Sequence, residues 1–126
     1  MSESTVDARE LYRRWIDELW NGPNDLAKLK AVAESLVSED FLGHWPSVEV
    51  AGPGKLAALI DATRSSYRDL VFEIEVGPFA DEGFVAGRWA GQGATSDGQT
   101  VYFSGNDILT VRDGRFTEYW VASSEM

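Results

Sequence analysis

The sequence contains no cysteine and only one histidine, His44. The absence of cysteine excludes a disulfide framework and a thiol nucleophile. A single histidine excludes a metal site built from several histidines, and the carboxylates show no recognisable ligand spacing. We therefore expect neither a bound metal nor a cofactor.

Basic residues are scarce. The chain has 11 Lys and Arg against 21 Asp and Glu, a formal net charge of −10. So negative a surface repels nucleic acid and anionic membranes, and the scattered basic residues form no nucleic-acid-binding stripe. No apolar run is long enough to span a bilayer, and the polar, acidic start of the chain is unlike a signal peptide. We expect a soluble cytoplasmic protein with no nucleic-acid and no membrane partner.

Several common catalytic motifs are also missing. Gly87, Gly91 and Gly93 lie inside a strand-like segment and lack the strand–turn–helix context of a phosphate-binding loop. No serine occupies a nucleophile-elbow motif, and His44 has no evident partners for a catalytic triad. A phosphate loop and a serine-hydrolase triad are therefore excluded.

What the chain does have is a high content of apolar and aromatic residues. Hydrophobic residues make up 44% of the 126 positions, with five Trp, four Tyr and six Phe. This composition excludes a disordered chain, and the length suits one domain over residues 1–126 with its own hydrophobic core.

The first half of the chain predicts three helices. The first is capped by Ser4 with Asp7 and ends at an Asn-Gly-Pro-Asn stop. The second is predicted over 24–37, with Asn24 as its cap, and the third over about 55–68. Residues 41–50 between them form a short irregular stretch. The apolar residues of the first helix recur every four positions, at Leu11, Trp15 and Leu19.

From residue 70 the apolar pattern changes to strict alternation, which is typical of strands. Strands are predicted over 70–76, 84–93 and 99–111, and a final strand follows the Asp113-Gly114 turn. Helices followed by a meander of antiparallel strands indicate an α+β fold, and the glycines of the second strand would permit strong bending or close approach to a ligand.

The third predicted strand is apolar on both faces. Val101 and Phe103 lie on one face, and Tyr102 and Ile108 on the other. Helices can cover only one of these faces, so we expect a partner subunit on the other, in a homodimer formed through the sheet.

The last hairpin carries the candidate chemistry. A two-residue turn at Asp113-Gly114 would place Asp107 opposite Trp120 and put Glu118 on the same face, roughly 7–8 Å away diagonally. Burying carboxylates on an apolar face is costly, and such burial raises a carboxyl pKa into the range of a general acid or base. The predicted shared face consists of Asp107, Leu109, Val111, Phe116, Glu118 and Trp120.

Four segments together resemble a known family. They are Trp-Ile-Asp-Glu-Leu-Trp-Asn-Gly at 15–22, Glu-Asp-Phe-Leu-Gly-His-Trp-Pro at 39–46, Val-Ala-Gly-Arg-Trp at 85–89 and the final hairpin at 107–120. They resemble SnoaL-like polyketide cyclases of the nuclear transport factor 2-like superfamily. The resemblance implies one SnoaL-like domain, with three N-terminal helices packed in a strongly curved, mainly antiparallel sheet. Such a cone, a cystatin-like α+β barrel, has a pocket at its mouth.

The resemblance also carries over residue by residue. Asp107 matches the pocket carboxylic acid of ketosteroid isomerase, whereas Trp15 and Trp45 stand where that enzyme has its oxyanion tyrosine and its general-base aspartate. Many SnoaL-like proteins have an acid/base aspartate directly after the last-strand tryptophan, and here that residue is Val121. Arg88 is the arginine that related epoxide hydrolases would use, but alternation puts it opposite Trp89, without flanking acids.

The candidate catalytic residues are therefore Asp107, Glu118 and His44. Asp107 could instead be a sheet-edge acid paired with a backbone N–H or an arginine, and Glu118 an ion-pair partner of Arg88 or Arg115. His44 could instead be a hydrogen-bonded wall residue. The candidate substrate-binding residues are aromatic and could equally belong to the core; they are Trp15, Trp45, Tyr67, Trp89 and Trp120.

Two functions follow. The first is cofactor-independent acid/base chemistry of the cyclase or isomerase type, with hydrolysis as a variant, on a small hydrophobic ring or polyketide-like molecule. The second is a non-catalytic domain of the same fold that binds a ligand or a protein. The absence of an acid at Val121 supports the second.

Overall fold

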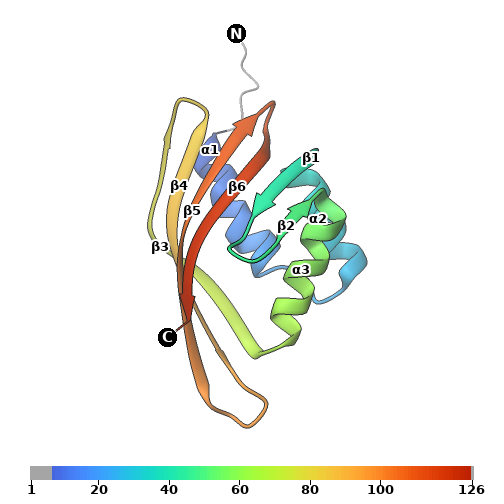
Figure 1. Ribbon diagram of the computed structural model, residues 1–126, viewed down its shortest axis with the longest axis vertical. Helices are drawn as coiled ribbons and strands as arrows, with labels where there is room; N and C mark the ends of the chain where they lie inside the picture. The colour runs from blue at the N-terminus through green and yellow to red at the C-terminus, as the bar shows by residue number, and fades with distance from the viewer. Residues whose placement is uncertain (1–6, 126) are drawn as a thin grey trace.

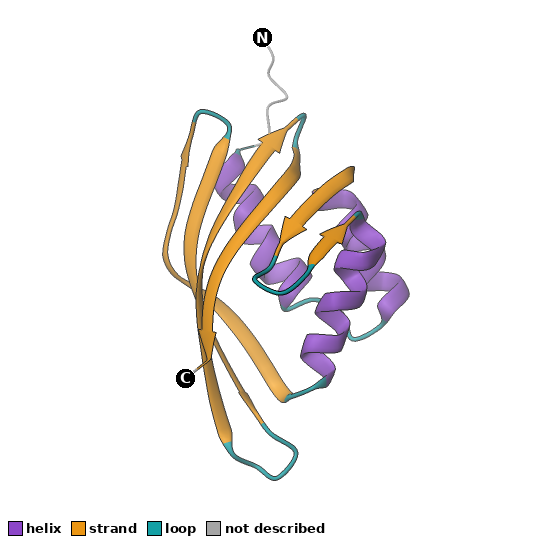
Figure 2. Ribbon diagram, viewed as in Figure 1, coloured by secondary structure: helices purple, strands orange, loops and turns teal. Residues whose placement is uncertain are grey.

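The computed structural model describes residues 7–125, which fold as helices packed against one curved sheet (Figures 1 and 2). Helix α1 (Ala8–Arg14) continues directly into a π-helix, η1 (Trp15–Trp20). Helix α2 (Leu26–Leu36) and helix α3 (Pro53–Ser65) follow. All the helices lie on the concave side of the sheet, so the opposite face of the long strands has no helical cover (Figure 1).

Six strands form the sheet in the order β2-β1-β6-β5-β4-β3. β1 pairs with β6 in parallel, and the other pairings are antiparallel. The predicted α+β class and mainly antiparallel curved sheet are confirmed. The strands are β1 (Val37–His44), β2 (Glu49–Ala51), β3 (Arg68–Asp81), β4 (Phe84–Ala94), β5 (Thr100–Arg112) and β6 (Arg115–Glu125).

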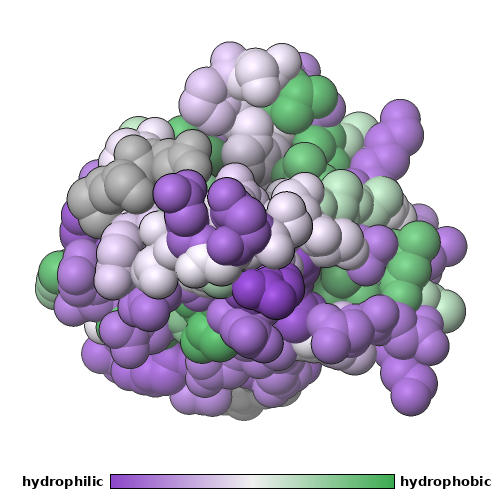
Figure 3. Space-filling model, turned by 90° about the horizontal axis from the view of Figure 1, so that it is seen from below, coloured by the Kyte–Doolittle hydropathy of each residue, from purple (hydrophilic) through white to green (hydrophobic). Residues whose placement is uncertain are grey.

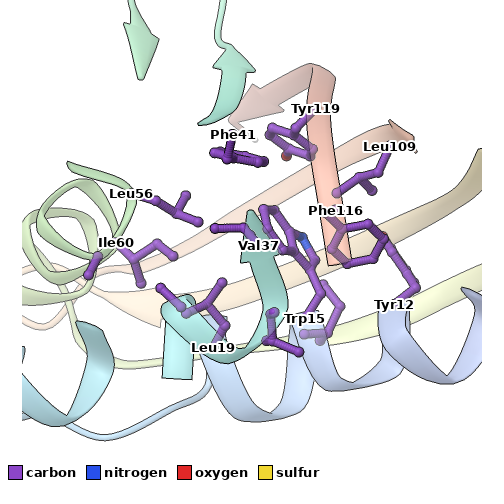
Figure 4. Close-up of a cluster of buried hydrophobic side chains, with 14 of the residues drawn as sticks. Tyr12, Trp15, Leu19, Val37, Phe41, Leu56, Ile60, Leu109, Phe116 and Tyr119 are labelled. Atoms are coloured by element: carbon purple, nitrogen blue, oxygen red, sulfur yellow. The ribbon is translucent and has the colours of Figure 1, made fainter. Parts of the chain in front are cut away.

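The core lies between the helices and the concave face of the sheet. Trp15 is at its centre, with its ring 5.0 Å from that of Tyr119 and 5.5 Å from that of Phe116 (Figure 4). Leu56 and Ile60 of α3 close the other side, and both are fully buried. A fully buried tryptophan removes a large apolar area from water, so this contact joins the helices to β6.

The helix boundaries differ from the prediction by one to three residues. Asp7 caps α1 by accepting a bond from the backbone N–H of Arg9, and Ser4 lies outside the described residues. Asp25, rather than Asn24, caps α2, because its carboxylate accepts from two backbone N–H groups of the first turn. Helix α3 begins with Pro53, directly after Gly52 in a left-handed conformation.

The stretch predicted to be irregular contains two strands. Residues 37–44 form β1 and residues 49–51 form β2. The strand β1 pairs in parallel with β6, the last strand of the chain, and such long-range pairing leaves no local pattern in the sequence.

The hairpin register is wrong beyond its first two pairs. Arg112 pairs with Arg115 and Val111 with Phe116, but the next pair is Thr110 with Glu118, which leaves Thr117 as an extra residue in β6. A bulge of this kind moves every later side chain to the opposite face. Asp107 therefore pairs with Val121, and Glu118 and Trp120 turn to the outer face.

The glycines of β4 make room for the protein's own aromatic rings rather than for a ligand. A Cβ atom at Gly87 would lie 2.6 Å from the ring of Tyr12, and one at Gly91 would lie 2.8 Å from the ring of Phe72. Any larger residue would push these rings away from the sheet.

The surface agrees with the acidic composition. Seen from below, much of the molecule is hydrophilic, and hydrophobic residues appear as separate patches (Figure 3). Within residues 7–125, none of the helices has both the length and the apolar character needed to cross a bilayer.

Asn21 joins the end of η1 to the sheet. Its amide donates to the carbonyl of Phe72 at 2.7 Å and accepts from the N–H of Phe72 at 2.8 Å. We expect Asn21→Ala to lower the free energy of unfolding by about 2 kcal/mol, because both backbone groups lose their partner. Urea denaturation measures this loss. Asn24→Ala, at an exposed position nearby, is the control and should have little effect; equal stability of both variants would contradict the role of Asn21.

Candidate active site

A cavity of about 310 Å³ lies between the helices and the concave face of the sheet. Its wall is mostly aromatic and aliphatic, and among the lining residues in the described range 7–125 only Asp107 carries a formal charge. The lining residues are Ile16, Trp20, Trp45, Thr63, Leu70, Phe72, Trp89, Phe103, Asp107, Tyr119, Val121, Ser123 and Ser124. An apolar cavity with a few polar groups is the usual form of a small-molecule site.

Asp107 is 1% exposed, and three side chains donate hydrogen bonds to its carboxylate. The hydroxyl of Tyr119 donates to Oδ1 at 2.7 Å, and the indole N–H of Trp89 donates to the same oxygen at 3.0 Å. The hydroxyl of Tyr12 donates to Oδ2 at 2.9 Å. The carboxylate is therefore held in one orientation by groups from α1, β4 and β6.

Burial raises the pKa of Asp107 from 3.8 to about 6. The bonds from Tyr119, Trp89 and Tyr12 act in the opposite direction, because they stabilise the ionised form, but burial has the larger effect. A carboxyl with this pKa exchanges its proton readily near neutral pH, as a general acid or base must.

The two tyrosines remain protonated. Burial, followed by the negative charge of Asp107, raises the pKa of Tyr12 and that of Tyr119 well above the ordinary value of 10.0. Both phenols are thus permanent donors to Asp107. Tyr119 lines the cavity together with Asp107, so the hydrogen bond between them lies at the cavity wall.

Two backbone irregularities position these groups. The π-helix η1 carries Ile16 and Trp20, which line the cavity, and π-turns inside helices are frequently found at functional sites. The bulge at Thr117 brings Tyr119 and Val121 to the inner face of β6, beside Asp107.

The structure brings some of the predicted aromatic residues together and not others. Trp45 and Trp89 line the cavity. Trp15 is a core residue with 0% exposure and does not line it, and Tyr67 packs edge-on against Phe103 at 5.1 Å behind the wall. Trp120 is on the outer face, because the bulge reverses its direction.

His44 and Glu118 are also outside the cavity. Nε2 of His44 lies 2.6 Å from a carboxylate oxygen of Glu118, and Nδ1 lies 2.8 Å from one of Glu49. The imidazole ring stacks on Trp120 with centroids 5.6 Å apart. The hydrogen bond that the imidazole donates to the carboxylate of Glu118 is the main cause of a raised His44 pKa. This cluster links β2, β1 and β6 on the outer face, so Glu118 pairs with His44 rather than with Arg88 or Arg115.

Arg88 also faces outward, where it has an acidic partner that the sequence did not reveal. Its Nε lies 2.8 Å from a carboxylate oxygen of Glu75 on β3. The part of the chain that the structure describes therefore places no Asp-Arg-Asp arrangement in the cavity, since Arg88 is outside it and Asp107 is its one charged lining residue.

Several site residues were not predicted. Tyr12 and Tyr119 hold Asp107, and Trp20, Phe72 and Phe103 line the cavity. Tyr12 belongs to an apolar row of the first helix, where its hydroxyl gave the only sign that it needs a polar partner. Tyr119 would have been found only if the bulge had been recognised.

Within residues 7–125 no three His, Cys, Asp or Glu side chains are grouped so as to hold a metal ion. Among the described lining residues, the side chains with oxygen atoms are Asp107, Tyr119, Thr63, Ser123 and Ser124.

Asp107→Asn removes the titration of this carboxyl. The native pKa of about 6 exceeds the ordinary 3.8, so between these pH values the folded state binds more protons than the unfolded state. The contribution of Asp107 to the free energy of unfolding of wild type therefore falls by about 3 kcal/mol as pH rises through this interval, and the variant lacks this contribution. We expect the difference in free energy of unfolding, variant minus wild type, to increase as pH rises through this interval. Urea denaturation at a series of pH values measures this difference. A difference that is constant from pH 4 to pH 8 would contradict the raised pKa.

Comparison with known structures shows many proteins with the same fold. A SnoaL-like polyketide cyclase from Jannaschia sp. CCS1 aligns with 98% of this chain and 91% of its own, at 17% identity and a TM-score of 0.77. IdmH of Streptomyces antibioticus, named as a polyketide cyclase, aligns over 94% and 93% at 14% identity and a TM-score of 0.76. An isomerase of the SnoaL-like family from Agrobacterium tumefaciens aligns over 91% and 92% at 19% identity and a TM-score of 0.71.

Sequence identities as low as these establish a shared fold but not a shared reaction. No curated protein shows significant sequence similarity to the chain. The SnoaL-like domain family, however, matches residues 9–119, a range that contains Asp107 and its three hydrogen-bond partners. The chain therefore belongs to the SnoaL-like domain family.

Proposed function

We propose that the protein is a cofactor-independent enzyme that moves a proton next to a carbonyl group of a small hydrophobic molecule, in a cyclisation or isomerisation. The observation that carries the proposal is Asp107, a buried carboxyl with a pKa of about 6 at the wall of an apolar cavity. Burying such a group is costly, and perturbed carboxyls of this kind are concentrated at functional sites.

In the proposed reaction, ionised Asp107 removes a proton from the carbon beside the carbonyl, and the electron pair of that C–H bond forms an enolate. In an isomerisation, the protonated carboxyl then returns the proton to another atom of the same molecule. In a cyclisation, the enolate carbon attacks a second carbonyl carbon of the molecule, the π electrons of that C=O bond move to its oxygen, and this oxygen takes up the proton from Asp107. The hydroxyl of Ser123 at the cavity wall is a donor for the enolate oxygen, whereas those of Tyr119 and Thr63 already donate to Asp107 and to the carbonyl of Leu59. The apolar wall keeps water away from the intermediate.

The fold comparisons support this class without identifying the substrate. Structural neighbours are named as polyketide cyclases and as an isomerase. A flat ring system would find aromatic faces on several sides of the cavity, from Trp45, Phe72 and Trp89.

A second function, ligand binding without catalysis, is favoured by one observation. The carboxylate of Asp107 accepts three bonds, and Val121 beside it supplies no second acid. The three bonds lower the basicity that burial alone would give this carboxylate. With no second acid beside it, the roles of general acid and general base cannot be shared between two carboxyls. Proton transfer measured directly distinguishes the two functions.

Hydrogen–deuterium exchange of a fused-ring ketone, 2-tetralone, tests the proposal without knowledge of the substrate. We expect the protein in D₂O to accelerate exchange of the hydrogens beside the carbonyl, with a rate that rises as Asp107 ionises through pH 6. Asp107→Asn should reduce the catalysed rate by about 100-fold or more. Proton NMR follows the loss of signal.

The matched control for this experiment is Asp17→Asn, which makes the same change at an exposed position of η1. It should exchange the ketone as fast as wild type. Equal rates for wild type and Asp107→Asn would overturn the catalytic function and favour binding alone.

We also propose that the protein forms a homodimer through the outer face of the sheet. A cross-strand row of paired residues runs across that face, and it consists of Phe79, Ala86, Ile108, Trp120 and His44. Phe79 is 64% exposed and Ile108 is 48% exposed. A contiguous, largely apolar row of this kind typically marks an interface. In a dimer with a two-fold axis, the row of one subunit packs against the same row of its partner.

A charge in this row should separate the subunits. We expect wild type to have the mass of a dimer in size-exclusion chromatography with light scattering, and Ile108→Lys to have the mass of a monomer, because the lysine would be buried without a partner. Leu26→Lys, an equally exposed position on the helical side, is the control and should remain dimeric. A monomeric wild-type protein would refute the dimer.

A further inference from the structure

Within residues 7–125, no basic side chain pairs with the carboxylate of Asp107. Its three partners, Tyr12, Trp89 and Tyr119, are neutral donors, and no lysine, arginine or histidine is among the residues that line the cavity. The nearby basic side chains are engaged elsewhere: Arg88 pairs with Glu75 on the outer face, and Arg64 donates to the carbonyls of Gly22 and Pro23.

This arrangement makes the cavity electrically negative. Neutral donors stabilise the carboxylate but cancel none of its net charge, and the apolar wall screens that charge far less than water would. An anionic ligand in the cavity would be repelled, whereas a cation would supply the missing counter-charge.

The aromatic wall has the same preference. Three indoles and three six-membered rings face the cavity, and they form neighbouring pairs: Trp20 with Phe72 at 5.4 Å, Phe72 with Trp89 at 5.4 Å, and Trp45 with Tyr119 at 4.9 Å. The face of an aromatic ring is negative and attracts cations, indole most strongly. The six residues are Trp20, Trp45, Phe72, Trp89, Phe103 and Tyr119.

The charge of the whole molecule acts in the same direction. With a net charge of −10, the protein attracts cations from solution and repels anions. Carboxylate, aromatic wall and overall charge are independent features, and all three favour a positively charged ligand.

We propose that the cavity binds a small organic cation, a substituted ammonium group that carries apolar or aromatic substituents. The ammonium group lies against the indole and phenyl faces beside Asp107, and its substituents fill the rest of the cavity of about 310 Å³. As a statement about substrate class, this inference rests on the proposed function; as a statement about what the cavity binds, it does not depend on turnover.

Three compounds of similar shape and different charge test it. Benzyltrimethylammonium is the cation, 2-methyl-1-phenyl-2-propanol the neutral analogue and phenylmethanesulfonate the anion. We expect the cation to bind about tenfold more tightly than the neutral analogue, and the anion not to bind measurably. Isothermal titration calorimetry gives the affinities, and quenching of the fluorescence of Trp20, Trp45 and Trp89 reports on occupation of the cavity.

Variants show whether Asp107 is the cause. Asp107→Asn should reduce the preference for the cation to less than about threefold while the neutral analogue binds as before, because the amide keeps the shape of the carboxyl. Asp17→Asn removes one negative charge, as Asp107→Asn does, but at an exposed site, and it should retain the full preference for the cation. Near-ultraviolet circular dichroism confirms that both variants are folded.

The pH dependence supplies an independent readout. The ammonium charge of the probe is permanent, and the other titratable groups that face Asp107, Tyr12 and Tyr119, stay protonated. Cation binding should therefore strengthen several-fold from pH 5 to pH 7.5 as Asp107 ionises, and binding of the neutral analogue should not.

The possible outcomes separate this inference from the catalytic proposal. No cation binding, equal binding of cation and neutral analogue, or an undiminished preference in Asp107→Asn would each overturn the cation site. Cation binding that depends on Asp107, in a protein that does not exchange 2-tetralone, would leave the cation site standing and refute the catalytic function. Exchange of the ketone with no preference for the cation would refute the cation site and leave the catalytic function standing.

Discussion

The hydrogen-bonded carboxylate of Asp107 is the constraint on which the rest of this structure depends. An ionised carboxyl with 1% exposure is tolerated only because Tyr12, Trp89 and Tyr119 donate to it. These donors come from α1, β4 and β6, so the requirement to satisfy one side chain fixes the position of the first helix against three neighbouring strands. Gly87 belongs to the same arrangement, since only a glycine leaves room for the ring of Tyr12.

The bulge at Thr117 gives the sheet two chemically different faces. On the inner face, Asp107 meets Tyr119 and Val121 in an apolar cavity. On the outer face, Glu118 instead pairs with His44, which is partly open to solvent. In a hairpin without the bulge, Asp107 and Glu118 would lie on the same face of the sheet. Because β6 has one extra residue, Asp107 is buried beside neutral donors, whereas Glu118 forms an ion pair with His44 that joins β6 to β1.

Much of the fold could be predicted from local patterns. The four-residue spacing of Leu11, Trp15 and Leu19 and the alternation over 70–76 reflect which face of each element is buried, and burial is the main force in folding. The strand β1 could not be predicted, because its pairing with β6 joins residues far apart in the chain and needs no particular residue type. For the site, Asp107 could be identified because a carboxylate in an apolar strand violates the usual pattern, whereas Tyr12 resembles any other aromatic core residue.

The sequence by itself therefore determined the α+β class, the Asp-Gly turn of the last hairpin, the SnoaL-like resemblance and the choice of Asp107 as a candidate. Each of these depends on the types of residues that lie close together in the chain. Only the tertiary structure decided which side chains face Asp107. Alternation along a strand is a rule of period two, and a single unpaired residue at Thr117 reverses it for all that follows. Trp15 became core and Trp120 surface for the same kind of reason: the direction of a side chain depends on contacts made across the whole chain.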